Sequence, residues 1–328
     1  MSKLSIAMAT YNGAQYLREQ LNSIVNQTRK PDEMVICDDC SEDETIEIVK
    51  SFASRVLFPV HLIINDRRLG STKNFEKAIS HCSGDIIILA DQDDVWHPTK
   101  LEKIEDVFMN DNNVGAVFTN ALLVDEYLNS LGYTLWESIK FNNKEQDKIK
   151  NNKTIQVLLK HNVVTGATLA FRAKYRDLIL PIPINWIHDG WIALLVAAVS
   201  NLALIQEPLI LYRQHPKQQI GVRRKKLKDR LLEMIFSPKD YSINTKRVFM
   251  EYIDQYVSVI QRLKSSKYDI GEDVFKQLES KVEHVQLRAY INNIPKIRRI
   301  FLIIKELINF RYFYYSNGIY SALRDLLL

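Results

Sequence analysis

The stretch from Gly84 to Leu101 constrains the possible fold more than any other part of the chain. It opens with five apolar residues, Ile86 to Ala90, which are uncharged and rich in β-branched side chains and therefore predict a short buried strand. A helix pattern begins near Pro98, because proline is favoured at an early helical position. Between the strand and the helix stand three carboxylates, Asp91, Asp93 and Asp94.

These three carboxylates follow a strand and precede a helix, which is where open α/β sheets bind their ligands. Clustered carboxylates repel one another, so the cluster needs a compensating cation. A hard divalent ion with oxygen ligands, bridging to a diphosphate, is one candidate for what the cluster binds. A solvated acidic turn that caps the next helix is the other reading, and the cluster alone does not decide between the two.

Strand and helix patterns alternate through the residues before this stretch. Buried strands are predicted at Leu4–Ala9, Glu33–Cys37 and Val60–Ile64, with helical spacing between them. Such alternation predicts βαβ units and a mainly parallel sheet. The second strand ends in Asp38 and Asp39, so two strand ends deliver carboxylates to one sheet edge, which indicates a nucleotide-type site.

Three other segments carry local predictions. Ser41, with Glu44 three residues later, has the pattern of a capping box at a helix start. The polar residues from 126 to 152 indicate an exposed, mobile insertion. The uncharged stretch between Asp189 and Glu207 falls short of the ~20 apolar residues that a membrane span needs, so we expect a buried helix that leads into a strand.

The composition indicates a globular protein with a distinct carboxyl-terminal region. The chain has 328 residues, of which 46% are hydrophobic and 25% charged. Residues 1–222 contain 23 basic and 27 acidic side chains, whereas residues 223–328 contain 21 basic and 12 acidic ones. We expect an α/β domain over 1–222 and a basic helical region over 223–328. The three cysteines and the absence of a signal-peptide pattern favour a reduced, cytoplasmic protein over a redox role for Cys37 and Cys40.

The carboxyl-terminal region combines basic and apolar residues. One basic cluster runs from Arg223 to Arg230, and a second, Lys296 to Arg299, precedes the apolar run Ile300–Ile304. Such a pattern suits an amphipathic helix on an anionic membrane, here the inner face of the cell membrane. Packing on the first domain, or on a second copy in a homodimer, is the alternative. We expect no nucleic-acid partner.

A series of motifs stands in one order along the chain: Ser5–Asn12, Val35–Ser41, Gly70–Asn74, Asp91–Asp94, His188–Asp189 and Tyr212–His215. Together they resemble the motifs of the family 2 glycosyltransferases. The resemblance covers residues 3 to 222 and is nearest to bacterial polysaccharide enzymes described as rhamnosyltransferases. Cys40 stands where the family often has glycine, and Ala9 where it often has threonine or serine.

This resemblance implies a GT-A fold, a Rossmann-like mixed and mainly parallel sheet flanked by helices. It also implies inverting transfer of a sugar from a UDP- or dTDP-sugar, dTDP-rhamnose among them, to a hydroxyl of a growing, lipid-linked surface polysaccharide. The departing diphosphate would be stabilised by a divalent cation, Mn²⁺ or Mg²⁺.

The resemblance assigns roles to individual residues. Metal binding falls to Asp93, Asp94 and His215, although one of the neighbouring carboxylates would contact the ribose or a metal-bound water instead. The nucleotide sugar would be bound by Thr10, Tyr11, Asn12, Asp38, Asp39, Lys73, Asn74, Asp91, Gln92 and Arg213. Within that set, Tyr11 would stack on the base. Asp39 would accept the imide N–H of uracil or thymine, a role that Asp38 could also fill.

Asp189 is the predicted catalytic base, which takes the proton from the acceptor hydroxyl. It lies between Trp186 and Trp191 at the start of the apolar helix, where partial burial would raise its pKa. An N-cap at the start of that helix is the structural alternative for this aspartate.

Two other functions compete with sugar transfer. A nucleotidyltransferase usually opens with a glycine-rich, basic loop after the first strand, but the loop Thr10–Gly13 has no basic residue. A catalytically inactive nucleotide-binding scaffold of a polysaccharide assembly complex is the second competitor. Nucleotide binding without turnover of any donor would favour it.

Overall fold

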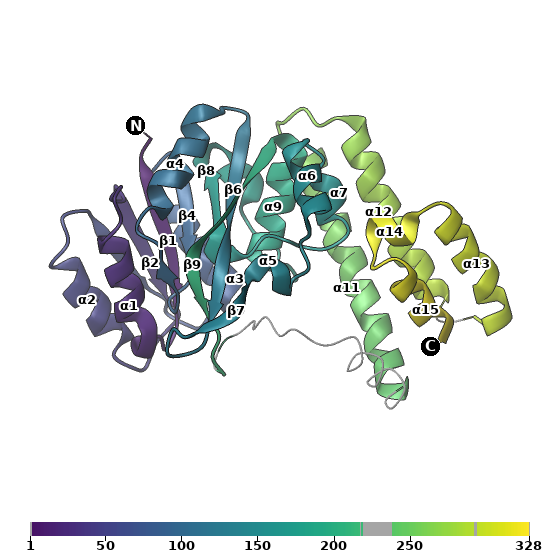
Figure 1. Cartoon of the computed structure of the whole chain (residues 1–328), viewed down its shortest axis with the longest axis horizontal. Helices are drawn as coiled ribbons and strands as arrows, with labels where there is room; N and C mark the ends of the chain where they lie inside the picture. Colours follow the sequence, from purple (N-terminus) through teal and green to yellow (C-terminus); the bar gives the residue numbers. More distant parts are fainter. Residues whose placement is uncertain (1, 217, 219–237, 292–293, 328) are drawn as a thin grey trace. The chain divides into compact units, whose positions relative to one another are not determined.

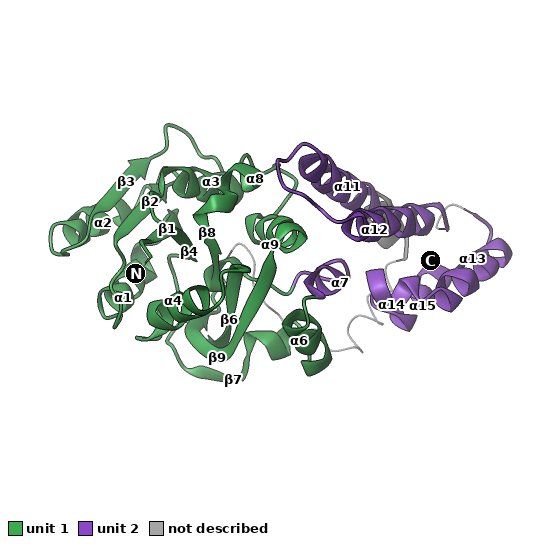
Figure 2. Cartoon of the chain, turned by 90° about the horizontal axis from the view of Figure 1, so that it is seen from above, with its two compact units in different colours: residues 1–152, 163–222 green, residues 153–162, 223–328 purple. Residues whose placement is uncertain are grey.

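The computed structural model describes residues 2–216, 218, 238–291 and 294–327 (Figure 1). The chain divides into two compact units, residues 1–152 with 163–222 and residues 153–162 with 223–328 (Figure 2). The short segment 153–162 therefore belongs with the carboxyl-terminal residues, which the sequence pattern does not predict. The predicted boundary at 222/223 and the basic cluster from 223 to 230 lie outside the described residues.

The first unit is built on one mixed sheet. Its strands are β1 (Leu4–Thr10), β2 (Glu33–Asp38), β3 (Val60–Ile64), β4 (Ile86–Ala90), β5 (Val95–Trp96), β6 (Val114–Val124), β7 (Ser130–Thr134), β8 (Leu169–Arg172) and β9 (Asn201–Arg213). The order is β3-β2-β1-β4-β8-β6-β9-β5, and β7 pairs with β6. Strands β1 to β4 run parallel to one another. Strand β8 runs antiparallel to β4 and β6, whereas β6 and β9 are parallel. The predicted mainly parallel α/β sheet is confirmed.

Helices cover this sheet on the pattern that the sequence predicts (Figure 1). They include α1 (Ala14–Val25), α2 (Thr45–Ala53), α3 (Ser71–His81), α4 (Lys100–Asn110), α8 (Arg176–Ile179) and α9 (His188–Val199). The apolar stretch after Asp189 does form a buried helix followed by a strand, α9 and β9. Trp191 in α9 is fully buried, and its indole Nε1 donates to the carbonyl of Ile179 at 2.8 Å.

Strand register brings the carboxyl ends of the first strands together. Thr10 stands opposite Asp38, Asp38 opposite Ile64, and Met8 opposite Ala90. The loops that follow β1, β2 and β4 therefore leave the sheet at one edge, as the alternating pattern requires.

Two local predictions are wrong. Residues 126–152 form β7, α5 (Leu135–Ser138) and α6 (Asn143–Lys150), and both helices begin with a capping box, so this segment has its own regular structure. Ser41 caps no helix: α2 begins at Thr45, and its N-cap Glu44 makes no side-chain capping hydrogen bond. The Ser41 hydroxyl instead donates to the carboxylate of Asp38 at 2.6 Å.

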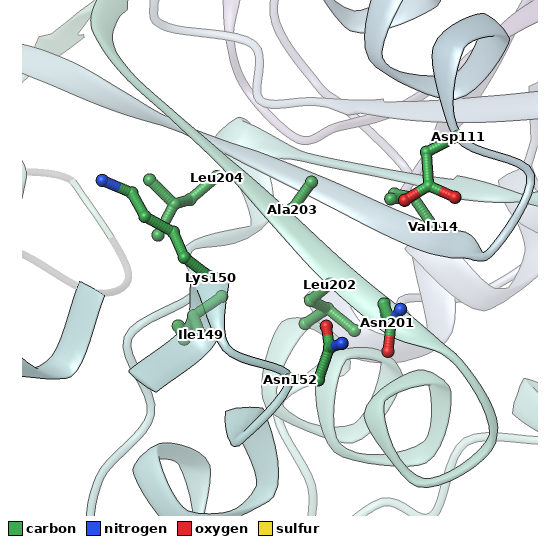
Figure 3. A pocket seen from close by; sticks show the side chains of 9 residues that line it. All are labelled: Asp111, Val114, Ile149, Lys150, Asn152, Asn201, Leu202, Ala203 and Leu204. Carbon is green, nitrogen blue, oxygen red and sulfur yellow. The ribbon is translucent and has the colours of Figure 1, made fainter. Parts of the chain in front are cut away.

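A pocket of about 220 Å³ lies beside β9 and α6 (Figure 3). Its lining comprises Asp111, Val114, Ile149, Lys150, Asn152, Asn201, Leu202, Ala203 and Leu204. Val114 and Asn201 begin β6 and β9, so the pocket lies toward the amino ends of these strands. None of the residues that the sequence marks as functional lines it, and the pocket is therefore separate from the predicted site.

The second unit is helical, as the periodicity predicts. It contains α7 (Thr154–Leu158), α11 (Pro238–Lys264), α12 (Glu272–Ile291), α13 (Lys296–Ile308), α14 (Arg311–Tyr315) and α15 (Ile319–Leu327). Across the described residues, none of the helices has the length and apolar character to cross a membrane.

Gly84 is a position where the sheet leaves no room for a side chain. Its N–H donates to the Ser5 hydroxyl at 2.7 Å, and an added Cβ would lie 2.5 Å from that hydroxyl oxygen and 2.7 Å from the carbonyl of Lys3. We therefore expect Gly84→Ala to lower the free energy of unfolding by about 1–3 kcal/mol, the usual cost of overpacking.

Urea denaturation followed by tryptophan fluorescence measures this effect, because Trp96, Trp136, Trp186 and Trp191 all lie in the first unit. Ser51→Ala on the exposed side of α2 is the matched control and should stay within about 0.5 kcal/mol of the parent chain. Equal stability of Gly84→Ala and the parent would contradict the close approach.

Candidate functional site

The three carboxylates after β4 stand in a strongly negative environment, in which Asp94 is buried and Asp91 and Asp93 are partly exposed. Asp94 is fully buried; its Oδ1 accepts the backbone N–H of Arg213 at 3.0 Å, whereas its Oδ2 has no hydrogen-bond partner among the described residues. Burial, together with the charges of Asp93 and Asp91, raises the pKa of Asp94 well above its usual range. Burial and the charges of Asp93 and Asp189 raise the pKa of Asp91 to about 7.

Tyr212 shows that Asp189 belongs to the same cluster. Burial raises the pKa of this phenol first, and the negative charges of Asp91, Asp94, Asp93 and Asp189 raise it further. The pKa of this one phenol is thus raised by four carboxylates, three from the loop after β4 and one from the start of α9. The predicted base is therefore brought to the predicted metal-binding motif, although nearly a hundred residues separate them in the chain.

Asp189 is not the N-cap of α9. That position is held by Ile187, with no side-chain capping hydrogen bond. Asp189 instead accepts the N–H of Gly166 at 3.0 Å, and also the N–H of its neighbour Gly190. The structural alternative considered from the sequence is thus wrong, while the catalytic role remains a prediction.

His188 is buried beside Asp189. Its ring stacks on Phe75 at 4.1 Å between centroids, and neither ring nitrogen has a hydrogen-bond partner among the described residues. Burial lowers the pKa of His188 to about 3, so the imidazole is neutral. Its Nε2 lies so close to Gly166 that a Cβ there would approach to 2.5 Å. His188 therefore packs the loop whose N–H holds Asp189.

Arg213 ties the carboxylate loop to β9. Its side chain is only 1% exposed, and its Nε donates to the carbonyl of Asp93 at 2.7 Å. The remaining nitrogens contact the carbonyl of Glu126 and the carboxylate of Glu19, and the guanidinium lies over the ring of Tyr16 at 4.5 Å. Protein groups thus engage this guanidinium on several sides, which makes Arg213 a positioning residue; its predicted contact with the nucleotide stays a prediction.

His215 is brought to Asp93, as a shared ligand role requires. Its Nε2 lies 2.9 Å from Asp93 Oδ2, its ring packs against Tyr16, and its buried Nδ1 has no hydrogen-bond partner among the described residues. A carboxylate oxygen and an imidazole nitrogen are donors that Mn²⁺ accepts. The pair fits a divalent ion in its chemistry, but no three His, Cys, Asp or Glu side chains of the described chain are arranged to hold one.

Lys100 is a component of the site that the sequence does not reveal. It is fully buried at the start of α4; its ammonium donates to the carbonyl of Ala167 at 2.9 Å and lies 3.7 Å from the centre of the Trp96 ring. Burial lowers the pKa of Lys100 to about 7, against the opposing effect of Asp94 and Asp91. A lysine in the first turn of a helix ordinarily points to solvent. The one local signal of its inward direction is helical spacing, because Lys100 precedes the buried Ile104 and Phe108 by four and eight residues.

The residues predicted to bind the base form a buried hydrogen-bond network. Asp39 accepts the N–H groups of Leu69 at 2.6 Å and Gly70 at 2.8 Å, and the amide of Asn65 at 2.9 Å. Asp38 accepts the hydroxyl of Thr10 at 2.7 Å. These contacts fix the loops at the ends of β1, β2 and β3 against one another.

Asn74 joins the same network from α3. Its amide nitrogen donates to the carbonyls of Cys37 at 2.8 Å and Thr10 at 3.3 Å, and its amide oxygen accepts from Asn65 at 2.9 Å. The structure therefore gives Asn74 a positioning role between two strand ends.

Burial raises the pKa of the Cys37 thiol to about 12, which works against the redox role that the C-x-x-C spacing allows.

Tyr11 and Gln92 connect the first loop to the carboxylate loop. The Gln92 side-chain amide accepts the N–H of Tyr11 at 2.9 Å and donates to its carbonyl at 3.0 Å. The guanidinium of Arg68 lies over the Tyr11 ring at 3.8 Å, a contact that the sequence does not indicate. A base that stacks on Tyr11 would have to displace or join this cation.

Two further predicted nucleotide-binding residues also have protein partners. The ammonium of Lys73 forms an ion pair with Glu76 at 2.7 Å. Asn12 has a positive φ of 46°, and its side-chain oxygen accepts the N–H of Glu42 at 2.9 Å. Their roles toward a nucleotide stay predictions.

The buried charges at Lys100 and Asp94 should be energetically coupled. In a double-mutant cycle with Lys100→Met and Asp94→Asn, we expect a favourable coupling free energy of about 0.5–3 kcal/mol, because the charge of each group favours the ionised form of the other. Urea denaturation in the presence of EDTA gives the four stabilities. The pair Lys100→Met and Asp106→Asn, with an exposed aspartate on α4, should be additive. Additivity of the first pair as well would refute the interaction.

Comparison with known proteins places this geometry in a family. Residues 5–162 match the model of glycosyl transferase family 2. An uncharacterised glycosyltransferase of Nostoc sp. is 26% identical over 224 residues, which span 65% of this chain and 65% of that protein, slightly less than two thirds of its length.

Two solved structures have a similar fold. S. aureus TarS 1–349 in complex with UDP-GlcNAc superposes with a TM-score of 0.57 and 16% identity over 99% of this chain and 88% of that one. The mannosyltransferase PcManGT from Pyrobaculum calidifontis, in complex with GDP-Man and Mn²⁺, has a TM-score of 0.50 and 16% identity over 99% and 85% of the two chains. Residues 5–162 form a glycosyl transferase family 2 domain, and the chain has the GT-A fold.

Proposed function

We propose that this protein transfers a sugar from a nucleotide diphosphate sugar to an acceptor hydroxyl, with inversion at the transferred carbon. The observation that carries the proposal is the proximity of Asp189 to the carboxylate cluster after β4. The charge of Asp189 contributes to the raised pKa of both Asp91 and Tyr212. An inverting transfer needs a base near, but separate from, the group that binds the leaving diphosphate. Family membership supports the same reaction class.

In this reaction the carboxylate of Asp189 accepts the proton of the acceptor hydroxyl. The acceptor oxygen forms a bond to the anomeric carbon while the bond from that carbon to the diphosphate oxygen breaks, and the nucleoside diphosphate leaves. The hydrogen bond from the Gly166 N–H fixes the orientation of the carboxylate before the acceptor arrives. Such preorganisation lowers the cost of aligning base and nucleophile.

A divalent cation would be held by Asp93 and His215, with Asp94 as a further candidate ligand. When bound, it would act as a Lewis acid that stabilises charge on the leaving diphosphate. The donor atoms of the 2.9 Å pair support this assignment, as does the Mn²⁺ in the complex of the structurally similar mannosyltransferase. Arg213 would position Asp93 through its carbonyl.

The donor would be a UDP- or dTDP-sugar, dTDP-rhamnose among them. Asp39 would accept the imide N–H of the pyrimidine, because its Oδ2 has a single backbone partner, Gly70, and a carboxylate oxygen can accept more than one hydrogen bond. The UDP-GlcNAc complex of the structurally similar TarS supports a uridine nucleotide. The acceptor would be a lipid-linked surface polysaccharide, and the free cysteines support a reducing, cytoplasmic location.

Replacement of the base should separate turnover from binding. We expect Asp189→Asn to lower turnover at least ~10²-fold, the scale of a lost general base, while the affinity for the nucleoside diphosphate stays within a few-fold. The measurement is release of nucleoside diphosphate from a panel of UDP- and dTDP-sugars with an oligosaccharide acceptor. Asp106→Asn, exposed on α4, is the matched control and should keep full turnover. An Asp189→Asn protein as active as this control would refute the assignment.

Nucleotide recognition should depend on both the base and the metal. In thermal-shift measurements we expect UDP or dTDP with Mn²⁺ to stabilise the protein by about 2.7 kcal/mol at ~100 times the Kd, and GDP and CDP to stabilise it much less. Asp93→Asn should remove the Mn²⁺-dependent part of the shift. Equal shifts for all four nucleotides would contradict the Asp39 role, and a shift without turnover of any donor would favour the inactive scaffold.

A further inference from the structure

The last three helices of the second unit are α13, α14 and α15 (Figure 2). Beside a small apolar core that includes Ile303 and Ala322, they also bury charged side chains. Both carboxylates of residues 294–327, Glu306 and Asp325, are buried, at 2% and 0% exposure, and Arg299 is buried with them. Large apolar side chains of the same helices face outward instead, and Phe301 is 75% exposed. A helical unit in water ordinarily shows the opposite arrangement.

The buried carboxylates have hydrogen-bond partners inside the unit, so the cost of removing them from water is offset there. Arg288 of α12 forms a two-point pair with Asp325 at 2.6 and 2.9 Å, and the Tyr312 hydroxyl donates to the same carboxylate at 2.8 Å. Glu306 lies 2.6 Å from Nδ1 of the buried His284. These contacts fix which face of each helix points inward and therefore which face points out.

The outward face of α13 is a continuous apolar stripe. It consists of Ile297, Ile300, Phe301, Ile304 and Ile308, all of them exposed. Their spacing of three and four residues places them on one side of the helix, opposite Arg299 and Glu306. The neighbouring α15 has a second stripe at four-residue steps, Ile319, Leu323 and Leu327, also exposed.

Cations border the α13 stripe. Arg298 and Lys305 are exposed and seven residues apart, which is close to two turns, so they lie along one side of the stripe; exposed Lys296 lies on the other side. Because both carboxylates of residues 294–327 are buried, the charged groups on the surface of these helices are all positive.

We propose that the apolar stripe of α13, with its bordering cations, docks on the surface of an anionic lipid bilayer. Apolar side chains would enter the boundary between head groups and acyl chains, while the lysine and arginine side chains reach lipid phosphates. With 13 residues, α13 is far shorter than the ~20 needed to span a membrane, so it lies in the plane of the surface.

Charge complementarity favours lipid over a second copy of this chain as the occupant. A twofold dimer brings the same patch against itself, and here that would place cation against cation with no exposed carboxylate from residues 294–327 to pair with them. Anionic phosphates supply the missing charge. Lipid docking is a further property beside the proposed sugar transfer. Binding of the protein to lipid vesicles requires neither a sugar donor nor an acceptor.

Flotation with vesicles tests the proposal on the full chain. We expect binding to vesicles of phosphatidylcholine with 30% phosphatidylglycerol, a several-fold weaker association with pure phosphatidylcholine, and a decrease in 0.5 M NaCl. The double variant Ile297→Ser with Phe301→Ser should bind at least ~10-fold more weakly, because two exposed apolar side chains no longer enter the bilayer. Both positions are exposed, so the core is left intact.

The control carries the same chemical change in the first unit. Leu57→Ser with Met109→Ser removes two exposed apolar side chains and should bind like the parent, and an unchanged unfolding midpoint in urea checks that every variant is folded. Vesicle binding by the α13 variant equal to that of the parent would overturn the proposal. So would a parent that fails to float at low salt, or a dimer in sedimentation that the α13 substitutions dissociate; none of these results depends on sugar transfer.

Discussion

The repulsion among four carboxylates at one sheet edge is the constraint on which the first unit depends. Burial strengthens this repulsion, because the low dielectric of the interior screens charge poorly. The charge of the buried Lys100 on α4 opposes it at Asp91 and Asp94. Arg213 at the end of β9 contributes hydrogen bonds, from its guanidinium to the carbonyl of Asp93 and from its backbone N–H to the carboxylate of Asp94. The end of the sheet, the carboxylate loop and the first helix are held together by this balance.

The polar residues of the site fall into two groups by what they already contact. Asp39, Asn74 and Arg213 have most of their hydrogen-bonding groups occupied by neighbouring loops, so they fix the shape of those loops. Asp93, His215 and Asp189 stand at the centre, where unpartnered groups such as His215 Nδ1 and Asp94 Oδ2 remain within the described residues. Rigid surroundings with reactive groups at the middle are what preorganised catalysis requires.

The second unit also buries charged side chains, and there each of the buried carboxylates has a partner of its own. Its buried ions are paired within hydrogen-bonding distance, as in Arg288 with Asp325, so the cost of their burial is offset locally. Because the charges are satisfied inside, the outer faces of α13 and α15 are left to apolar side chains and a few cations. The second unit thus combines a satisfied ionic interior with an apolar, basic outer surface on α13.

Local sequence patterns predict most of the strands and helices of the first unit. The alternation of strands and helices, the carboxylates after Ala90 and the apolar helix after Asp189 follow from short-range periodicity, which local sterics and burial dictate. Where the prediction erred, at residues 126–152 and at Ser41, polar composition was taken for mobility and a local pattern for a cap. Tertiary contacts bring Asp189 to the cluster, direct the ammonium of Lys100 to the carbonyl of Ala167, and leave the apolar side of α13 uncovered. Each of these depends on which element packs opposite, and local periodicity does not identify that element.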